Sequence, residues 1–293
     1  MNYAQEYERY LSLTQSRLEH LCEQYLPENS TTAQAARYSL LAGGKRVRAI
    51  LVLAACGLLG GDEAKAADLA GAVEMLHCYS LIHDDLPCMD DDDTRRGRPS
   101  CHKAFGEATA MLAGDLLLTE AFEVVASTDL SPAARVRAAK ALSHGAGAYG
   151  MVYGQELDLY YEAHNPTEEQ LRLVHRNKTG ALINAAVQMG VAASDGSEED
   201  ANALEQYAYD LGLVFQIVDD VLDVTAAEET LGKPVGSDAE NGKTTFVTLY
   251  GVEACQKLAQ EMTERACQRL TGRYGQKAEF LCQMAQRLVE RSY

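Results

Sequence analysis

The sequence predicts an all-α protein, and three observations support this prediction. Apolar residues recur at helical spacing along most of the 293 residues, only 6 residues are proline, and no segment shows a convincing strand pattern. The hydrophobic fraction of 47% suits a chain that buries a large core. Because no linker or low-complexity tract interrupts the pattern, we expect residues 1–293 to form a single domain.

Turn and capping signals define the helices expected in the first half of the chain. A helix from about residue 5 to 25 ends before Pro27, and the next, from about residue 32, ends at a glycine cap formed by Gly43 and Gly44. An apolar helix follows from Lys45 to residues 60–61. Another begins near residue 63 and delivers two aspartates before Pro87 ends or bends it.

The second half of the chain continues in the same way. Residues 103–127 form one expected helix, and a serine-proline pair at 131–132 begins another that runs through residues 154–158. A capping box at Thr167 begins a helix that includes residues 178–180, and Ser197 caps the next, which ends at or soon after Asp223. A polar loop around residues 232–242 precedes two C-terminal helices.

The overall charge and cysteine pattern narrow the function classes. A net charge of −17 argues against nucleic acid as a partner, because phosphate backbones are bound by basic surfaces. The first residues are polar, so we expect no signal peptide, and the longest apolar run, 49–59, is too short to span a bilayer, so we expect no stable membrane insertion. Eight cysteines without a C-x-x-C pair favour reduced thiols and a cytoplasmic location.

The most highly charged stretch runs from His83 to His102. Carboxylates packed this closely repel one another unless cations neutralise them or water solvates them. Oxygen ligands suit Mg²⁺, which is commonly held by carboxylates together with substrate phosphates, and arginine binds phosphate well. The stretch therefore predicts a site for metal and phosphate. Its aspartates are Asp84, Asp85, Asp90, Asp91, Asp92 and Asp93, and its arginines are Arg95, Arg96 and Arg98.

A second acidic group lies on the helix that ends near residue 223. Asp219 and Asp223 are spaced i, i+4 on one face, Gln216 lies one turn earlier, and the flanking residues are apolar. Buried carboxylates are costly unless they bind an ion or are paired, although a single motif of this kind also fits a solvated acidic stripe. Two such sites in one helical bundle can hold several Mg²⁺ ions around a diphosphate.

The motifs together resemble those of the short-chain trans-prenyl diphosphate synthases, and among these the farnesyl diphosphate synthases of bacteria. The resemblance covers about residues 38–250 and implies an isoprenoid-synthase-type helical bundle with a central cavity, assembled as a homodimer. The extra residues between Asp85 and Asp90 look like the insertion of the bacterial farnesyl and plant-type geranylgeranyl enzymes. The matching motifs are Gly43-Gly44-Lys45-Arg46-Val47-Arg48, His77, Asp84-Asp85-x4-Asp90, Arg95-Arg96-Gly97, Gly154-Gln155-x2-Asp158, Lys178-Thr179-Gly180 and Phe215-Gln216-x2-Asp219-Asp220-x2-Asp223.

The resemblance implies a reaction. Isopentenyl diphosphate would be condensed with dimethylallyl and then geranyl diphosphate to (2E,6E)-farnesyl diphosphate, through ionisation of the allylic substrate, condensation and proton loss. About three Mg²⁺ ions per active site, with Mn²⁺ as an alternative, would assist the departure of diphosphate.

The resemblance also assigns the site residues. The implied metal ligands are Asp84, Asp85, Asp90, Asp219, Asp220 and Asp223. The allylic diphosphate would be held by Arg95, Lys178, Lys233 and Lys243, and isopentenyl diphosphate by Lys45, Arg48, His77 and Arg96. Dipoles near the cationic intermediate would come from Lys178, Thr179 and Gln216.

Product length is expected to depend on two residues before the first acidic motif. Ser80 lies one turn, about 5.4 Å, from Asp84 on the same helical face, and Tyr79 is its bulky neighbour. A large side chain there would stop elongation, and the Tyr79-Ser80 pair resembles the farnesyl pattern. Tyr79 as an ordinary core residue is the other interpretation.

Simpler interpretations exist for other site residues. Lys45 and Arg48 also fit surface cations at a helix start, although positive charges there oppose the helix dipole unless an anion is present. His77 alone would fit a satisfied core histidine. Two departures from the family are the Phe246-Val247 pair after the last lysine motif and a C-terminal tail whose nearby cations are only Arg287 and Arg291.

Four competing functions are distinguishable. A geranylgeranyl or geranyl diphosphate synthase differs only in product length. A class I terpene cyclase usually carries another motif in place of the second aspartate motif and does not need the isopentenyl cations. A calcium loop that begins at Asp90 fails, because Arg95 and Cys101 occupy its sixth and twelfth positions. A catalytically silent subunit would be expected to have lost part of an aspartate motif, and both are intact.

Overall fold

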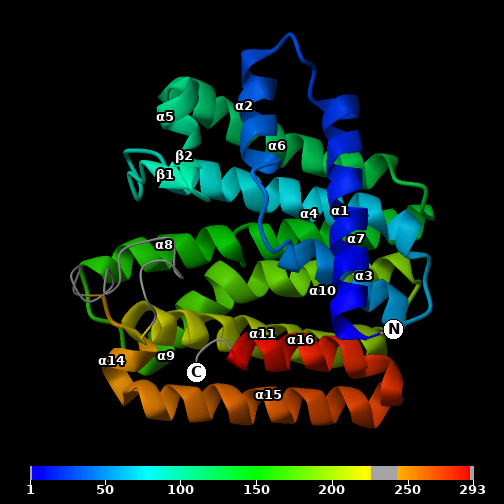
Figure 1. Cartoon of the computed structure of the whole chain (residues 1–293), viewed down its shortest axis with the longest axis vertical. Coiled ribbons are helices and arrows are strands. Elements are labelled where there is room, and N and C mark those ends of the chain that lie inside the picture. The colour runs from blue at the N-terminus through cyan, green and yellow to red at the C-terminus, as the bar shows by residue number, and fades with distance from the viewer. Residues whose placement is uncertain (1, 226–242, 291–293) are drawn as a thin grey trace. The chain divides into compact units, whose positions relative to one another are not determined.

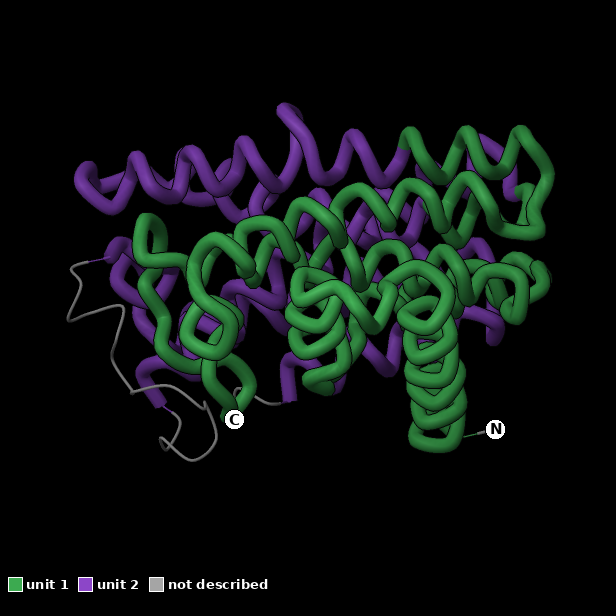
Figure 2. The backbone as a smooth tube through the Cα atoms, turned by 90° about the horizontal axis from the view of Figure 1, so that it is seen from above, with its two compact units in different colours: residues 1–140, 189–195 green, residues 141–188, 196–293 purple. Residues whose placement is uncertain are grey.

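The computed structural model describes residues 2–225 and 243–290 and confirms the predicted all-α fold (Figure 1). The described chain divides into two compact units, coloured separately in Figure 2. The single domain expected over residues 1–293 stays a prediction. No helix within the described ranges combines the length and apolar composition needed to cross a bilayer.

Unit 1 contains residues 1–140 and 189–195 and is built around the helix that leads to the first acidic motif. This helix, α4, packs against α1, α3 and α6, and apolar side chains bury it over most of its length. The elements of this part are α1 (Tyr3–Tyr25), α2 (Thr31–Leu40), α3 (Val47–Leu58), α4 (Glu63–Asp84), β1 (Thr94–Arg95), β2 (Arg98–Pro99), α5 (Cys101–Phe105), α6 (Glu107–Ser127) and α7 (Pro132–Ala146), whose last residues belong to unit 2.

A short β-hairpin corrects the expectation that the chain contains no strand. Strands β1 and β2 pair antiparallel, with Thr94 opposite Pro99 and Arg95 opposite Arg98. The two turn residues, Arg96 and Gly97, have positive φ angles of 55° and 74°, which is typical of a tight hairpin turn. Two residues per strand are too few to produce an alternating pattern in the sequence.

Two helices predicted as continuous are interrupted. The helix expected over residues 103–127 is divided into α5 and α6 at Gly106, whose φ is 86°. The helix expected from residue 131 through residue 158 ends at Ala146, and α8 begins at Met151. Both predictions were wrong because apolar residues keep their helical spacing on both sides of each break, so the spacing does not reveal the glycine-containing interruption.

Unit 2 contains residues 141–188 and 196–293 and is built on the helix of the second acidic motif. Apolar residues of α11 pack with α9, α14, α15 and α16 in one buried cluster that includes Ile217, Val218 and Phe246. Its further elements are α8 (Met151–Glu162), α9 (Glu168–His175), the π-helical turn η1 (Arg176–Gly180), α10 (Ala181–Ala193), of which residues 189–193 belong to unit 1, α11 (Glu198–Thr225), α14 (Phe246–Tyr250), α15 (Val252–Tyr274), the 3₁₀ turn η2 (Gly275–Ala278) and α16 (Glu279–Glu290).

Candidate active site

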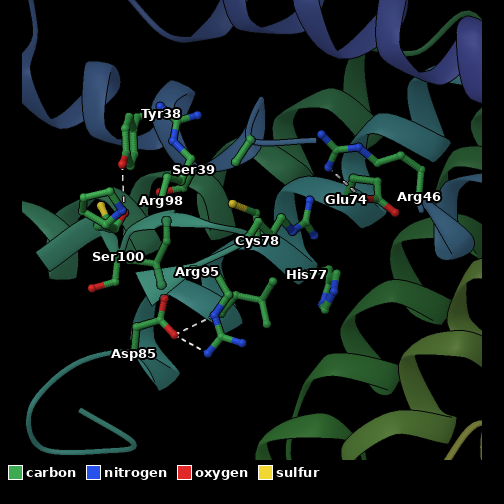
Figure 3. Close-up of a pocket in the computed structure, with 16 residues that line it drawn as sticks. Tyr38, Ser39, Arg46, Glu74, His77, Cys78, Asp85, Arg95, Arg98 and Ser100 are labelled. Carbon is green, nitrogen blue, oxygen red and sulfur yellow. Dashed lines mark hydrogen bonds and ion pairs between the residues drawn. The ribbon is translucent and has the colours of Figure 1, made fainter. Parts of the chain in front are cut away.

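Unit 1 contains a pocket lined by cationic side chains, shown in Figure 3. It is formed where the end of α2 and the loop after it, the middle and end of α4, the hairpin and the start of α5 come together. The polar side chains that line it are Tyr38, Ser39, Arg46, Glu74, His77, Asp85, Arg95, Arg96, Arg98 and Ser100.

Arg48 and His77 form a contact that fixes the tautomer of the imidazole. Arg48 Nη1 lies 3.2 Å from His77 Nε2, and because a guanidinium can only donate, Nε2 accepts and Nδ1 carries the proton. Burial, followed by the charge of Arg48, holds the pKa of His77 well below its usual value. His77 is therefore a neutral donor, and its buried Nδ1 has no hydrogen-bond partner among the described residues.

The first turn of α3 and the hairpin turn keep their positive charges available. Burial, with a smaller contribution from the Arg96 charge, lowers the pKa of the Arg48 guanidinium to about 10, so it is still charged at neutral pH. Arg96 lies against Gly44, whose φ is 120° and where a Cβ atom would overlap the guanidinium. Within residues 2–225 and 243–290, neither Arg48 nor Arg96 has a carboxylate at ion-pair distance. Two such cations favour an anionic ligand.

The first acidic motif begins at the end of α4. Asp85 follows the last helical residue, is only 2% exposed, and accepts a hydrogen bond from Arg95 Nε at 2.8 Å. Arg95 also binds Asp92 Oδ2 at 2.9 Å, which identifies a partner for one of the outer aspartates. The Asp90 amide donates to the Asp84 carbonyl at 2.9 Å and so folds the loop back onto the helix end.

Unit 2 contains a pocket of about 180 Å³ that gathers several predicted residues. Asp158 Oδ2 accepts hydrogen bonds from Lys178 Nζ at 2.6 Å and from Lys243 Nζ at 3.3 Å. Burial alone would raise the pKa of Asp158, but the two ammonium groups outweigh it and hold this pKa below its usual value. The lining residues are Asp158, Tyr161, Pro166, Leu171, Val174, His175, Lys178, Gln216, Asp219, Asp220, Lys243, Thr244 and Thr245.

A close helix contact brings Asp158 to Lys178. Helix α8 packs on the π-helical turn η1 at Gly154, where a Cβ atom would overlap the backbone of Lys178. Asp158 lies one helical turn after Gly154 and therefore on the same face of α8. The glycine and the aspartate of the Gly-Gln-x-x-Asp motif thus act together: the first allows the approach, and the second pairs with the lysine.

The second acidic motif is largely buried on α11. Asp220 is 8% exposed, and its Oδ2 accepts a hydrogen bond from the Phe246 amide at 2.8 Å. Asp219 and Asp220 line the pocket, whereas Asp223, which is 2% exposed, and Thr179, which is 9% exposed, do not. The predicted metal role of Asp223 and catalytic role of Thr179 stay predictions, and Lys233 lies outside the described residues.

The donor set fits a divalent cation that arrives with its ligand. Across the two described ranges, no three carboxylate, imidazole or thiol groups are already close enough to hold a metal ion. The two acidic motifs nevertheless supply hard oxygen donors, and Mg²⁺ commonly takes only one or two carboxylates and completes its shell with water and substrate phosphates. The residues therefore fit Mg²⁺ bound together with a phosphate-bearing ligand.

Tyr79 and Ser80 line neither pocket. Tyr79 is 8% exposed and packs edge-to-face on His83, with ring centroids 5.6 Å apart. His83 Nε2 in turn lies 3.0 Å from the Met111 carbonyl of α6. Ser80 Oγ donates to the His77 carbonyl at 2.9 Å. Tyr79 is thus held in place by its neighbours.

Two residues of the pockets were not predicted from the sequence, and a third was given no role. Glu74, on the buried face of α4, binds Arg46 in the first pocket, and the signal was a carboxylate within the apolar segment 69–76. His175 lines the second pocket and packs on Phe246, with ring centroids 5.5 Å apart, and burial lowers its pKa to about 4. Asp158 was noted only as part of a motif, without a role.

An all-α protein with one pocket lined by four arginines and another lined by two lysines, each beside an aspartate motif, fits the class of isoprenoid-synthase-type enzymes. The chain belongs to the polyprenyl synthetase family, whose defining pattern matches residues 29–283. This confirms the predicted trans-prenyltransferase at the level of the family.

Individual proteins show the same likeness. The chain is 48% identical to geranylgeranyl pyrophosphate synthase 3, chloroplastic, of Arabidopsis thaliana over 266 residues, which cover 89% of this chain and 74% of that protein. A geranyltransferase structure from Legionella pneumophila superposes with a TM-score of 0.88 at 40% identity, over 99% of this chain and 97% of that one. A geranyltransferase from Helicobacter pylori, complexed with magnesium and isoprenyl diphosphate, gives 0.86 at 35% identity, over 98% and 96%.

Proposed function

We propose that this protein condenses isopentenyl diphosphate with dimethylallyl and geranyl diphosphate and releases mainly (2E,6E)-farnesyl diphosphate. The observation that carries the proposal is the set of donors around Arg48 and His77. Arg48 and Arg96 have no carboxylate partner among the described residues, and the buried Nδ1–H of His77 has no protein acceptor. A diphosphate supplies the missing negative charge and acceptor oxygens together. Isopentenyl diphosphate would occupy this pocket, with Lys45 as a further cation.

The allylic diphosphate would be held by the lysines of the second pocket and by Arg95. Asp84, Asp85 and Asp90, with Asp219, Asp220 and Asp223, would hold about three Mg²⁺ ions. The Helicobacter pylori geranyltransferase, which is complexed with magnesium, supports the choice of metal. Bound Mg²⁺ neutralises charge that builds up on the departing diphosphate. Lys178 and Lys243 would add hydrogen bonds to its oxygens, and Lys233 is proposed to do the same.

The remaining residues would guide the cation formed when diphosphate leaves. The cation would be stabilised by the dipoles of Gln216, Thr179 and the Lys178 carbonyl. These dipoles would stabilise it without a charged side chain beside the hydrocarbon part of the substrate. The double bond of isopentenyl diphosphate attacks the cation, and a proton is then lost to the released diphosphate. The site must exclude water, because water would convert the cation to an alcohol.

Tyr79 supports farnesyl diphosphate as the main product. Its ring is held by His83, which contacts the α6 backbone, so it can act as a fixed floor against the growing chain. Geranylgeranyl diphosphate is the second candidate, because the Arabidopsis thaliana relative at 48% identity bears that product in its name. Replacing Tyr79 with alanine should lengthen the product if Tyr79 sets the length, and an unchanged C15 product would contradict this role.

The test is incubation with isopentenyl diphosphate, Mg²⁺ and each of dimethylallyl, geranyl and farnesyl diphosphate, followed by chromatographic sizing of the products. Consumption of no substrate pair would refute the proposal, and conversion of geranyl diphosphate alone to a cyclic hydrocarbon would indicate a terpene cyclase.

The variant Asp84→Ala should retain its fold and lose activity. A homodimer and a cytoplasmic location belong to the same proposal and are tested by light scattering and by cell fractionation.

A further inference from the structure

Glu74 is a buried carboxylate in the wall of the first pocket. It is 2% exposed, lies in the middle of α4, and binds Arg46 Nη1 through Oε2 at 3.1 Å (Figure 3). Arg46 is itself only 4% exposed. Loss of one partner from such a pair leaves an uncompensated buried charge, so the contact constrains both elements strongly.

The same carboxylate serves the beginning of α3. The residue before the first helical turn is Arg46, whose side chain makes no capping bond, and the Ala49 amide instead donates to Glu74 Oε1 at 3.2 Å. Amides of a first helical turn have no partner within their own helix, and a negative charge there is favourable. Glu74 therefore acts on α3 as a helix cap supplied by the neighbouring helix.

Arg46 transmits this contact to the loop before α3. Its backbone is in the left-handed region, with φ of 49°, and its Nη2 donates to the Leu40 carbonyl at the end of α2 at 2.6 Å. A left-handed arginine is strained and persists only where its surroundings hold it. The bonds to Glu74 and Leu40 provide that support.

The spacing along α4 connects this anchor to the ligand-binding residues. Glu74 and His77 are three residues apart and therefore lie on the same side of the helix. Glu74 contacts Arg46 and the Ala49 amide, while His77 contacts Arg48 between them. Two residues on one face of α4, Glu74 and His77, thus contact the start of α3.

We propose that Glu74 is a positioning residue for isopentenyl diphosphate: it holds the first turn of α3 so that Arg48 and His77 bind the diphosphate together. This inference rests on the proposed function. If Glu74 acted only through its negative charge, its removal from an anion site would tighten binding of the diphosphate. A positioning role predicts weaker binding, so the direction of the change in affinity distinguishes the two roles.

The test compares two variants of Glu74 with a matched control by calorimetric titration with isopentenyl diphosphate and by steady-state kinetics. Glu74→Gln removes the charge, and Glu74→Asp keeps the charge but shortens the side chain. Positioning predicts that both weaken binding and raise the KM for isopentenyl diphosphate about 10-fold, while the KM for geranyl diphosphate changes by less than about twofold. The control, Asp68→Asn, lies on the same helix as Glu74, breaks the ion pair between Asp68 and Arg17 of α1, and should change neither KM.

Unchanged or tighter binding in Glu74→Gln, wild-type binding in Glu74→Asp, or an equal rise of both KM values would overturn the inference. Inactive wild-type protein would instead refute the proposed function, which separates the two failures. Hydrogen exchange of the wild type tests the contact even if the variants do not fold. The Ala49 amide should exchange at least about 10-fold more slowly than in an unstructured peptide, and the peptide rate would contradict the contact.

Discussion

The two pockets handle their positive charges in different ways. In the pocket of unit 1, Glu74 neutralises Arg46 and Asp85 neutralises Arg95, but Arg96 has no carboxylate at ion-pair distance within the described residues. In the pocket of unit 2, Asp158 accepts from both Lys178 and Lys243. The first pocket therefore contains a positive charge that is available to an anion. In the second pocket, Asp158 is already hydrogen-bonded to both lysines.

This difference indicates how each pocket would accept a diphosphate. An anion can enter the first pocket without displacing a protein carboxylate. In the second, an anion competes with Asp158 for the lysines, and the aspartates of α11 add repulsion unless cations accompany the ligand. The first pocket should therefore bind diphosphate without metal, and the second should depend on metal.

The largest effect is expected from Asp219→Ala in the second pocket. Loss of a carboxylate that is proposed to hold Mg²⁺ should lower kcat about 1000-fold with the fold intact. The measurement is kcat at saturating substrates, with circular dichroism as a check on folding. The matched control is Asp210→Asn, on the same helix as Asp219, which breaks an ion pair with Arg269 of α15 and should retain activity. A kcat within tenfold of the wild type for Asp219→Ala would contradict the role.

Arg48→Gln tests the cation that contacts His77 beside the first pocket. Removal of this partly buried cationic donor should raise the KM for isopentenyl diphosphate about 100-fold and leave that for geranyl diphosphate nearly unchanged. Arg17→Gln, which removes a paired arginine of α1, is the control and should behave as the wild type. A parallel increase of both KM values would show that the two substrates do not use separate cation sets.

Asp158→Asn should make the second pocket resemble the first. Without the carboxylate, Lys178 and Lys243 lose their shared partner, so inorganic pyrophosphate should bind about 10-fold more tightly in the absence of metal. Calorimetry in the presence of a chelator measures this affinity. Weaker binding than the wild type would mean that Asp158 mainly orients the lysines rather than competing for them.

The smallest effect is expected from an ion pair outside both pockets, which provides a baseline. Hydrogen bonds from Ser197 and then Arg273 lower the pKa of Asp200 from 3.8 to about 2. Because its folded pKa is depressed, Asp200 stabilises the fold above pH 4, and this contribution is lost as the pH falls towards 2. Asp200→Asn should cost about 1 kcal/mol at pH 7, discounted for exposure, and leave kcat unchanged. Denaturant unfolding of the wild type and of Asp200→Asn at pH 7 and at pH 2 measures this cost in stability. An equal cost at the two pH values would contradict the depressed pKa of Asp200.

The sequence alone determined the features that depend on neighbours along the chain. The glycines before α3, the aspartates at the end of α4 and the aspartates of α11 were placed correctly because turn chemistry and helical period are local properties. The hairpin around Arg96 and the π-helical turn at Lys178 were missed. A two-residue ladder and a single widened turn leave almost no periodic signal.

Only the tertiary structure decided which charges are paired. Arg46 and Glu74 are 28 residues apart, and Lys178 and Asp158 are 20 apart, so no helical period relates them. Each pair forms because neighbouring helices pack closely, as α8 does where Gly154 meets the backbone of Lys178. Burial then makes an unpaired charge costly enough for these partners to hold one another. The sequence therefore predicted the residue types of the site, and packing decided which cations are available to a ligand.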